Sequence, residues 1–122
     1  MNDAPLRPHF SPVRCTETFA FVSGQLPFGS NQRIVTGDVG VQTQQCLRNI
    51  ETALSGAGLG LEDVVKTTVW LARVDDFARF NAAYAAAFAD RVPPARSTVR
   101  ADLMVEGALV EIEAVALRRN DR

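Results

Sequence analysis

The hydrophobic and polar positions of this chain follow two different periods. Runs of β-branched and aromatic residues favour strands, because such side chains pack well on a pleated surface. Six runs of this kind predict strands around Val13 and at residues 19–26, 33–35, 64–71, 97–103 and 109–117. Residues 16–18 are expected to turn the chain between the first two strands as a hairpin.

Two other segments repeat their apolar residues every three to four positions, which is the period of a helix. In the first, one face carries Leu47, Ile50, Leu54 and Ala57. Glycines at 56, 58 and 60 are expected to end this helix, because glycine readily adopts the left-handed conformation of helix ends. The second helix is expected to begin at an N-cap, Asp75, and to stop before Pro93 and Pro94. Its apolar face carries Phe77, Phe80, Tyr84 and Ala87 or Phe88.

The resulting order of elements, βββαβαββ, places the chain in the α+β class. A chain of 122 residues is long enough for one hydrophobic core, so residues 1–122 are expected to form a single domain. Two helices can cover only one face of the sheet. The predicted architecture is therefore a mixed β-sheet of about six strands with two helices on one face.

The last predicted strand is apolar on both faces. One face carries Val110, Ile112, Ala114 and Ala116, and the other carries Leu109, Val115 and Leu117. A strand that is apolar on both sides needs both sides buried. Because the helices cover one side only, we expect another copy of the chain to cover the other, which predicts a homo-oligomer.

Two carboxylates, Glu111 and Glu113, interrupt the second of these faces. Burying an unpaired carboxylate costs several kcal/mol, so a compensating cation is expected nearby. Arg96 and Arg100 are the candidates, because the last two strands are expected to be neighbours. Two interpretations stay open: an ion pair at the subunit interface, or a site in which Arg96, behind the rigid pair Pro93-Pro94, binds a small carboxylic acid bidentately.

Composition and charge narrow the possible functions. Apolar residues make up 47% of the chain and charged residues 22%, as in ordinary globular domains, and the net charge is −1. Such a balance does not favour nucleic acid or an acidic membrane as a partner, and no apolar run is long enough to span a bilayer. Residues 1–8 lack the hydrophobic segment of a signal peptide, and Cys15 and Cys46 show no metal-ligand spacing. We expect a cytoplasmic protein with reduced thiols, without a metal or other cofactor.

Five short segments, in order along the chain, carry a resemblance to a known family. They are Val22-Ser23-Gly24-Gln25, Val65-Lys66-Thr67-Thr68-Val69, Asp76-Phe77 with Asn81 and Tyr84, Pro94-Ala95-Arg96-Ser97, and Val110-Glu111-Ile112-Glu113-Ala114. Over roughly residues 8–118 the chain resembles the RidA (YjgF) family, whose members deaminate reactive enamine and imine intermediates. The resemblance implies a chorismate-mutase-like fold, assembled as a homotrimer with active sites in clefts between subunits.

The resemblance also implies roles for individual residues. Arg96 matches the arginine that binds the substrate carboxylate, and Glu111 matches the glutamate that orients and deprotonates the attacking water. The cleft-lining positions of the family correspond to Ser23, Gly24, Asn81 and the backbone around Thr98. At Phe10 the chain departs from the family, which carries a tyrosine there, so this position offers a ring without a hydroxyl group.

The function expected from these matches is the hydrolysis of 2-imino or enamine acids, such as 2-iminobutanoate and 2-iminopropanoate, to 2-keto acids and ammonia. Binding the carboxylate on Arg96 would hold the electrophilic carbon beside a water molecule, so neither a metal nor another cofactor is needed. The alternative is a module of the same fold that binds small carboxylates or proteins without turnover. A nuclease or translation inhibitor fits less well, because the chain lacks the basic clusters of nucleic-acid-binding proteins.

Overall fold

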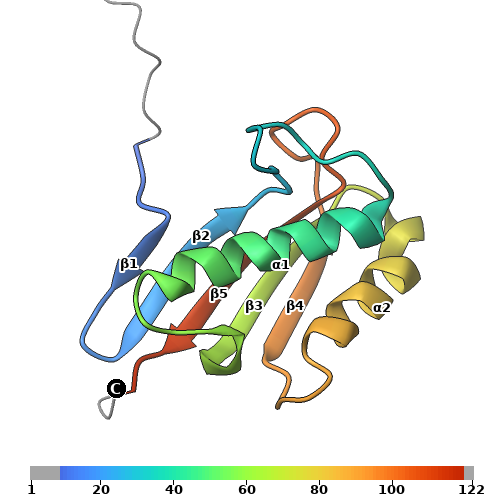
Figure 1. Cartoon of the computed structure of the whole chain (residues 1–122). Coiled ribbons are helices and arrows are strands. Elements are labelled where there is room, and N and C mark those ends of the chain that lie inside the picture. Colours follow the sequence, from blue (N-terminus) through green and yellow to red (C-terminus); the bar gives the residue numbers. More distant parts are fainter. Residues whose placement is uncertain (1–8, 120–122) are drawn as a thin grey trace, which may run out of the picture.

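In the computed structural model, which describes residues 9–119, a five-stranded sheet carries two α-helices on one face (Figure 1). The strands are β1 (Val13–Cys15), β2 (Phe19–Gln25), β3 (Val64–Leu71), β4 (Ala95–Arg100) and β5 (Val110–Leu117). The helices are α1 (Val39–Ser55) and α2 (Phe77–Ala87), and the short 3-10 turns η1 (Leu61–Asp63) and η2 (Val74–Asp76) precede β3 and α2.

The strand order across the sheet is β1-β2-β5-β3-β4. Strands β3 and β4 pair in parallel, and the other pairs within the described residues are antiparallel. This topology confirms the α+β prediction, with a mixed sheet and both helices on one face. It also confirms the hairpin between β1 and β2. The expectation that the last two strands are neighbours is wrong, because β3 lies between β4 and β5.

The sheet has five strands because the predicted strand at residues 33–35 does not join it. Ile34 forms only an isolated bridge with Phe28, within the same loop. The backbone of Gly29 bonds to Arg33, and Gln32 adopts a positive φ of 65°. These features close the segment into a tight turn, so its apolar residues pack locally instead of pairing with the sheet.

Both helices form where the apolar period predicts them, with differences at their ends. The Asp38 side chain caps α1 by accepting a hydrogen bond from the Val41 amide at 3.1 Å. The expected N-cap at Asp75 is wrong, because this residue lies inside η2 and α2 begins at Phe77. The strand predicted at residues 97–103 forms as β4, but it begins two residues earlier, at Ala95, directly after the two prolines. Within residues 9–119, neither helix is long and apolar enough to cross a membrane.

The two faces of β5 have the different surroundings that its sequence predicts. Its helix-facing residues form the centre of the core and are at most 2% exposed: Val110, Ile112, Ala114 and Ala116. Within residues 9–119 no helix covers the opposite face of the sheet (Figure 1), where the apolar side chains of Phe19, Phe21, Val99 and Leu117 stay 38–48% exposed. We call this second face the uncovered face.

Shortening a core side chain of α1 is expected to destabilise the fold. Ile50 is 1% exposed between α1 and the sheet, so Ile50→Ala should lower the free energy of unfolding by about 2–5 kcal/mol in urea titrations. Val41→Ala on the same helix is the control, because Val41 is 44% exposed and its truncation should change stability by about 0.5 kcal/mol or less. Equal losses in both variants would contradict the assignment of the core.

Candidate active site

The Arg96 guanidinium, at the edge of the sheet, packs on three aromatic rings of α2, which we call the aromatic bed. Its guanidinium carbon lies 4.8 Å from the ring centre of Tyr84, 5.2 Å from that of Phe80 and 5.8 Å from that of Phe77. Nη1 donates a hydrogen bond of 2.9 Å to Oδ1 of Asn81. Cation–π contacts contribute about 0.5–2 kcal/mol each, so the three rings and the amide together fix the direction of the guanidinium.

The aromatic bed is itself anchored in the core. The Tyr84 hydroxyl and Thr67 Oγ1 form a buried hydrogen bond of 2.7 Å, and the Tyr84 ring packs on Phe80 at 5.5 Å. Burial raises the pKa of Tyr84, with smaller opposing effects from Thr67 and Arg96, so the phenol stays neutral at physiological pH. A fixed ring gives Arg96 little freedom to turn away.

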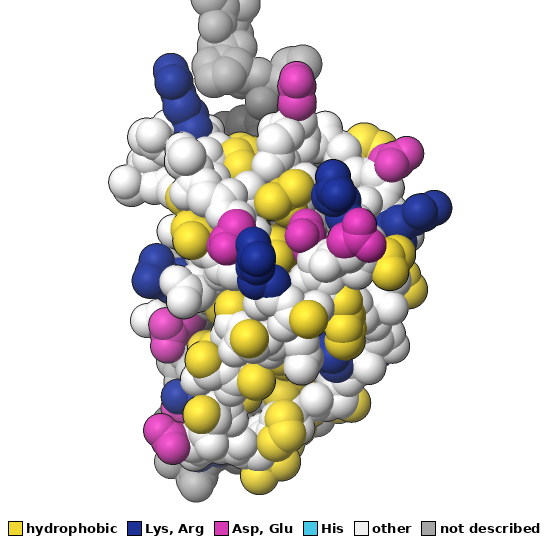
Figure 2. Space-filling model, turned by 90° about the vertical axis from the view of Figure 1, so that its right-hand side faces the viewer, with side chains coloured by type: hydrophobic (Ala, Val, Ile, Leu, Met, Phe, Trp, Pro, Cys, Tyr) yellow, Lys and Arg dark blue, Asp and Glu magenta, His cyan; other side chains and the backbone are white. Residues whose placement is uncertain are grey.

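Arg96 opens into a cleft of about 430 Å³ between α2 and the start of β4. The other lining residues are Asn81, Tyr84, Ala85, Phe88, Pro93 and Pro94. Figure 2 shows the side of the molecule that carries α2, with hydrophobic side chains over its lower half and charged side chains in a band above. Arg96 is half-buried, and no carboxylate between residues 9 and 119 lies within 4.0 Å of it. Its positive charge is therefore available to a ligand.

Glu111 lies on the uncovered face, above an irregularity in β2. Val22 pairs with Ala114 and Gln25 with Ile112, so Ser23 and Gly24 together stand opposite a single residue of β5 in a β-bulge. The bulge brings the Gly24 backbone against the Glu111 carboxylate, which occupies the place of a Cβ at Gly24. Burial first, and the charge of Glu113 second, raise the pKa of Glu111.

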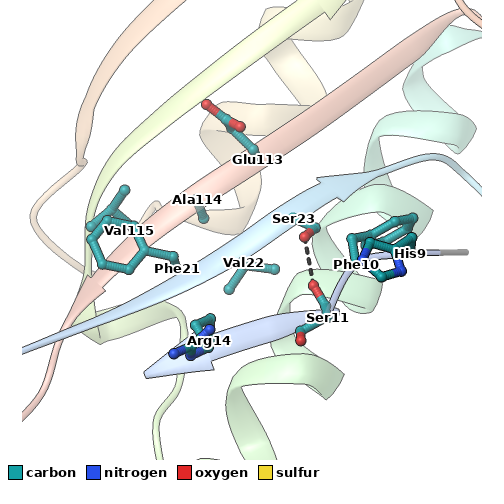
Figure 3. A pocket seen from close by; sticks show the side chains of 10 residues that line it. All are labelled: His9, Phe10, Ser11, Arg14, Phe21, Val22, Ser23, Glu113, Ala114 and Val115. Atoms are coloured by element: carbon teal, nitrogen blue, oxygen red, sulfur yellow. Dashed lines mark hydrogen bonds between the residues drawn. The ribbon is translucent and has the colours of Figure 1, made fainter. Parts of the chain in front are cut away.

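The bulge borders a pocket of about 680 Å³ on the uncovered face (Figure 3). Its lining includes Phe10, Ser23 and Glu113, together with His9, Ser11, Arg14, Phe21, Val22, Ala114 and Val115. Ser23 Oγ donates a 2.6 Å hydrogen bond to the Ser11 carbonyl, which ties the segment carrying Phe10 to β2. The pocket thus joins the N-terminal segment to the face that holds the two glutamates.

The expected proximity of Arg96 and Glu111 within one chain is wrong. Paired residues in a sheet share a face. Arg96 pairs with Thr67 on the helix-covered face, whereas Glu111 pairs with Trp70 on the uncovered face. With β3 between their strands as well, the two charged groups belong to different surfaces of the molecule.

The predicted site residues therefore form two groups. Arg96 and Asn81 meet in the cleft, and Thr98 follows two positions along β4 on the same face. Thr98 lines a separate small pocket with Phe77, and its Oγ1 is buried without a hydrogen-bond partner. The second group lies on or beside the uncovered face and contains Phe10, Ser23, Gly24 and Glu111.

The sequence interpretation missed the role of the α2 aromatic residues. Their helical spacing predicts a core face, and Phe80 and Tyr84 are buried as expected. The same rings also support Arg96, because its side chain extends from β4 toward α2. Spacing alone does not show a cation above these rings; Asn81, a polar residue one position from Phe80, was the only local signal. Within residues 9–119 no group of histidine, cysteine, aspartate and glutamate residues could hold a metal ion.

Comparison with known proteins gives a consistent assignment. The family model described as Endoribonuclease L-PSP matches residues 1–118. A RutC family protein of Pyrococcus horikoshii is 38% identical over 115 residues, which cover 93% of this chain and 90% of that protein. The 2-iminobutanoate/2-iminopropanoate deaminase of Salmonella typhimurium is 38% identical over 104 residues, or 84% of this chain and 81% of the enzyme.

Solved structures agree with this assignment. The YjgF gene product of E. coli superposes with a TM-score of 0.84 at 36% identity, covering 90% of this chain and 88% of its own. E. coli TdcF with bound serine gives a TM-score of 0.86 at 29% identity, covering 94% and 91%. Fold and sequence together define the class, an α+β protein of the YjgF type. The chain belongs to the YjgF/RidA family.

A side chain at Gly24 is expected to displace the Glu111 carboxylate. In Gly24→Ala the added methyl group would overlap the carboxylate oxygen and lie 3.1 Å from its carbon, so Glu111 must adopt another rotamer. A crystal structure of the variant should show the moved side chain. Gly56→Ala is the matched control, because its nearest neighbour is 3.6 Å away and its φ of −63° suits alanine. An unmoved Glu111 in Gly24→Ala would contradict the close approach.

Proposed function

We propose that this protein is an imine deaminase that hydrolyses small 2-imino acids to 2-keto acids and ammonia. The observation that carries the proposal is Arg96: a guanidinium fixed by three rings and an amide, facing a cleft, with no carboxylate partner within the described chain. A guanidinium in this state suits a ligand carboxylate, which it can bind through two parallel hydrogen bonds. The similar Salmonella protein is a 2-iminobutanoate/2-iminopropanoate deaminase, which supports the same chemistry.

A complete site requires a second subunit under this proposal. Arg96 and Glu111 lie on different surfaces of one chain, so they can act on one substrate only if the α2–β4 edge of one subunit meets the uncovered face of another. This contact would also cover the exposed apolar side chains of that face. We infer a homotrimer from the family resemblance, with three equivalent sites between neighbouring subunits.

The proposed reaction uses each group in a defined step. Arg96 binds the substrate carboxylate and thereby fixes the adjacent C=N carbon. Glu111 takes a proton from water as the water oxygen bonds to this carbon, and it passes that proton to the imine nitrogen to give a carbinolamine. Glu111 then takes the hydroxyl proton as the C=O bond forms and the C–N bond breaks, and it gives this proton to the nitrogen, which leaves as ammonia.

Ligand binding without turnover is the second candidate. The bound serine of TdcF favours it, because serine also carries a carboxylate beside a nitrogen-bearing carbon. Both candidates use Arg96 in the same way. They differ in whether Glu111 transfers protons, so only a turnover assay separates them.

Replacing Arg96 is expected to abolish the deaminase activity. In an assay that generates 2-iminopropanoate with an amino-acid oxidase and traps it with semicarbazide, the wild-type protein should lower the trapped product. Arg96→Ala should reduce kcat/KM at least ~100-fold, since it removes the charged bidentate contact. Arg96→Lys should recover only part of this loss, because an ammonium group lacks the planar fork.

Arg48→Ala is the control for this experiment, because Arg48 is an exposed arginine on α1 and lies outside the cleft. It should keep kcat/KM within about threefold of the wild type, as expected for a surface substitution. Full activity in a folded Arg96→Ala variant would reject the site. Binding of 2-keto acids by the wild type without any turnover would support the second candidate instead.

A further inference from the structure

Glu113 is a second carboxylate beside the proposed base, and the reaction described above assigns it no part. Ile112 separates the two glutamates and points into the core, so Glu111 and Glu113 project from the same face of β5. At a rise of about 3.3 Å per residue, their Cα atoms lie roughly 6.6 Å apart. Both side chains are partly buried, and Glu113 lines the pocket in Figure 3 beside Ser23.

The cations on the uncovered face, Arg14 and Lys66, lie in the row of paired residues that follows the row of Glu113. In that row Arg14 pairs with Phe21, Phe21 with Val115, and Val115 with Lys66. Within residues 9–119 neither comes within 4.0 Å of a carboxylate. The nearest charge to each glutamate along β5 is therefore the other glutamate.

Within residues 9–119, the neighbouring positions of β2, β3 and α1 bring no charged side chain to the pair, and from the N-terminal segment the titratable residue His9 lines the same pocket as Glu113. Beside Glu111, β3 contributes Trp70 and β2 contributes Gly24. Beside Glu113, β3 contributes Thr68. Beneath β5, α1 contributes Cys46, whose thiol is kept neutral because burial raises its pKa.

We propose that Glu113 is a positioning residue for imine hydrolysis, whose negative charge keeps the proton accepted by Glu111 available for the departing nitrogen. This inference rests on the proposed function. A base that must return its proton works best when it is protonated near the working pH, and a like charge at the next position on the same face of the strand favours that state. The raised pKa of Glu111, with Glu113 as its second cause, agrees with this geometry.

The test follows Glu111 in two ways, by the pH dependence of kcat/KM and by a 13C NMR titration of its carboxyl group. Glu113→Gln keeps the shape of the side chain and removes its charge. The titration midpoint of the Glu111 carboxyl group and the acidic limb of the kcat/KM profile should therefore both move to lower pH by about 0.5–1.5 units. Glu113→Asp keeps the charge and should leave both near their wild-type positions. Glu106→Gln, an exposed charge in the loop before β5, is the control and should shift neither.

Unchanged midpoints in Glu113→Gln, with an active wild type, would overturn this inference and leave the proposed function standing. Equal loss of rate in Glu113→Gln and Glu113→Asp, without a shift of the acidic limb, would show a structural role and also overturn it. A wild type that does not hydrolyse imines would instead reject the proposed function, and the role of Glu113 with it.

Discussion

The alternation of side chains along a β-strand is the constraint on which the rest of this structure depends. On β4 it directs Arg96 toward α2, where three rings and an amide hold it. On β5 it directs Ile112 into the core and Glu111 onto the uncovered face. Because the strands that carry them are separated by β3, no rotamer change can bring Arg96 and Glu111 together within one chain. The same register that builds the core thus divides the candidate site between two surfaces.

Each half of the site is unbalanced in charge when considered alone. The cleft presents a guanidinium with no carboxylate of residues 9–119 within 4.0 Å, whereas on the uncovered face partial burial and the charge of Glu113 raise the pKa of Glu111. The proposed substrate, which carries a carboxylate and an electrophilic C=N carbon, would complement both halves at once. The aromatic support of Arg96 and the bulge at Ser23–Gly24 fix the two groups before a ligand arrives, which lowers the cost of binding.

Most of the fold could be predicted from sequence, because periodicity fixes which residues face the core. The helices, the two-faced last strand and the strong breaks at Pro93-Pro94 followed directly from local patterns. The position of residues 33–35 could not, since a short apolar run does not show whether it pairs with the sheet or within its own loop. The separation of Arg96 from Glu111 also depends on strand order, which a parallel crossover sets and local sequence does not encode. For the site, the motifs identified the residue types, but the aromatic bed and the bulge required three-dimensional contacts.

The most direct test of the account asks whether one active site uses two chains. Arg96→Ala and Glu111→Gln subunits, each inactive alone, are unfolded together, refolded as mixed oligomers and assayed for imine hydrolysis. If Arg96 and Glu111 come from different subunits, random mixing of equal amounts gives each site an intact Arg96 with a probability of one half and an intact Glu111 with a probability of one half. About a quarter of the wild-type activity should therefore return. A mixture of Glu111→Gln with the double variant Arg96→Ala/Glu111→Gln should stay inactive. No recovery in the first mixture, although the subunits demonstrably exchange, would contradict the shared site.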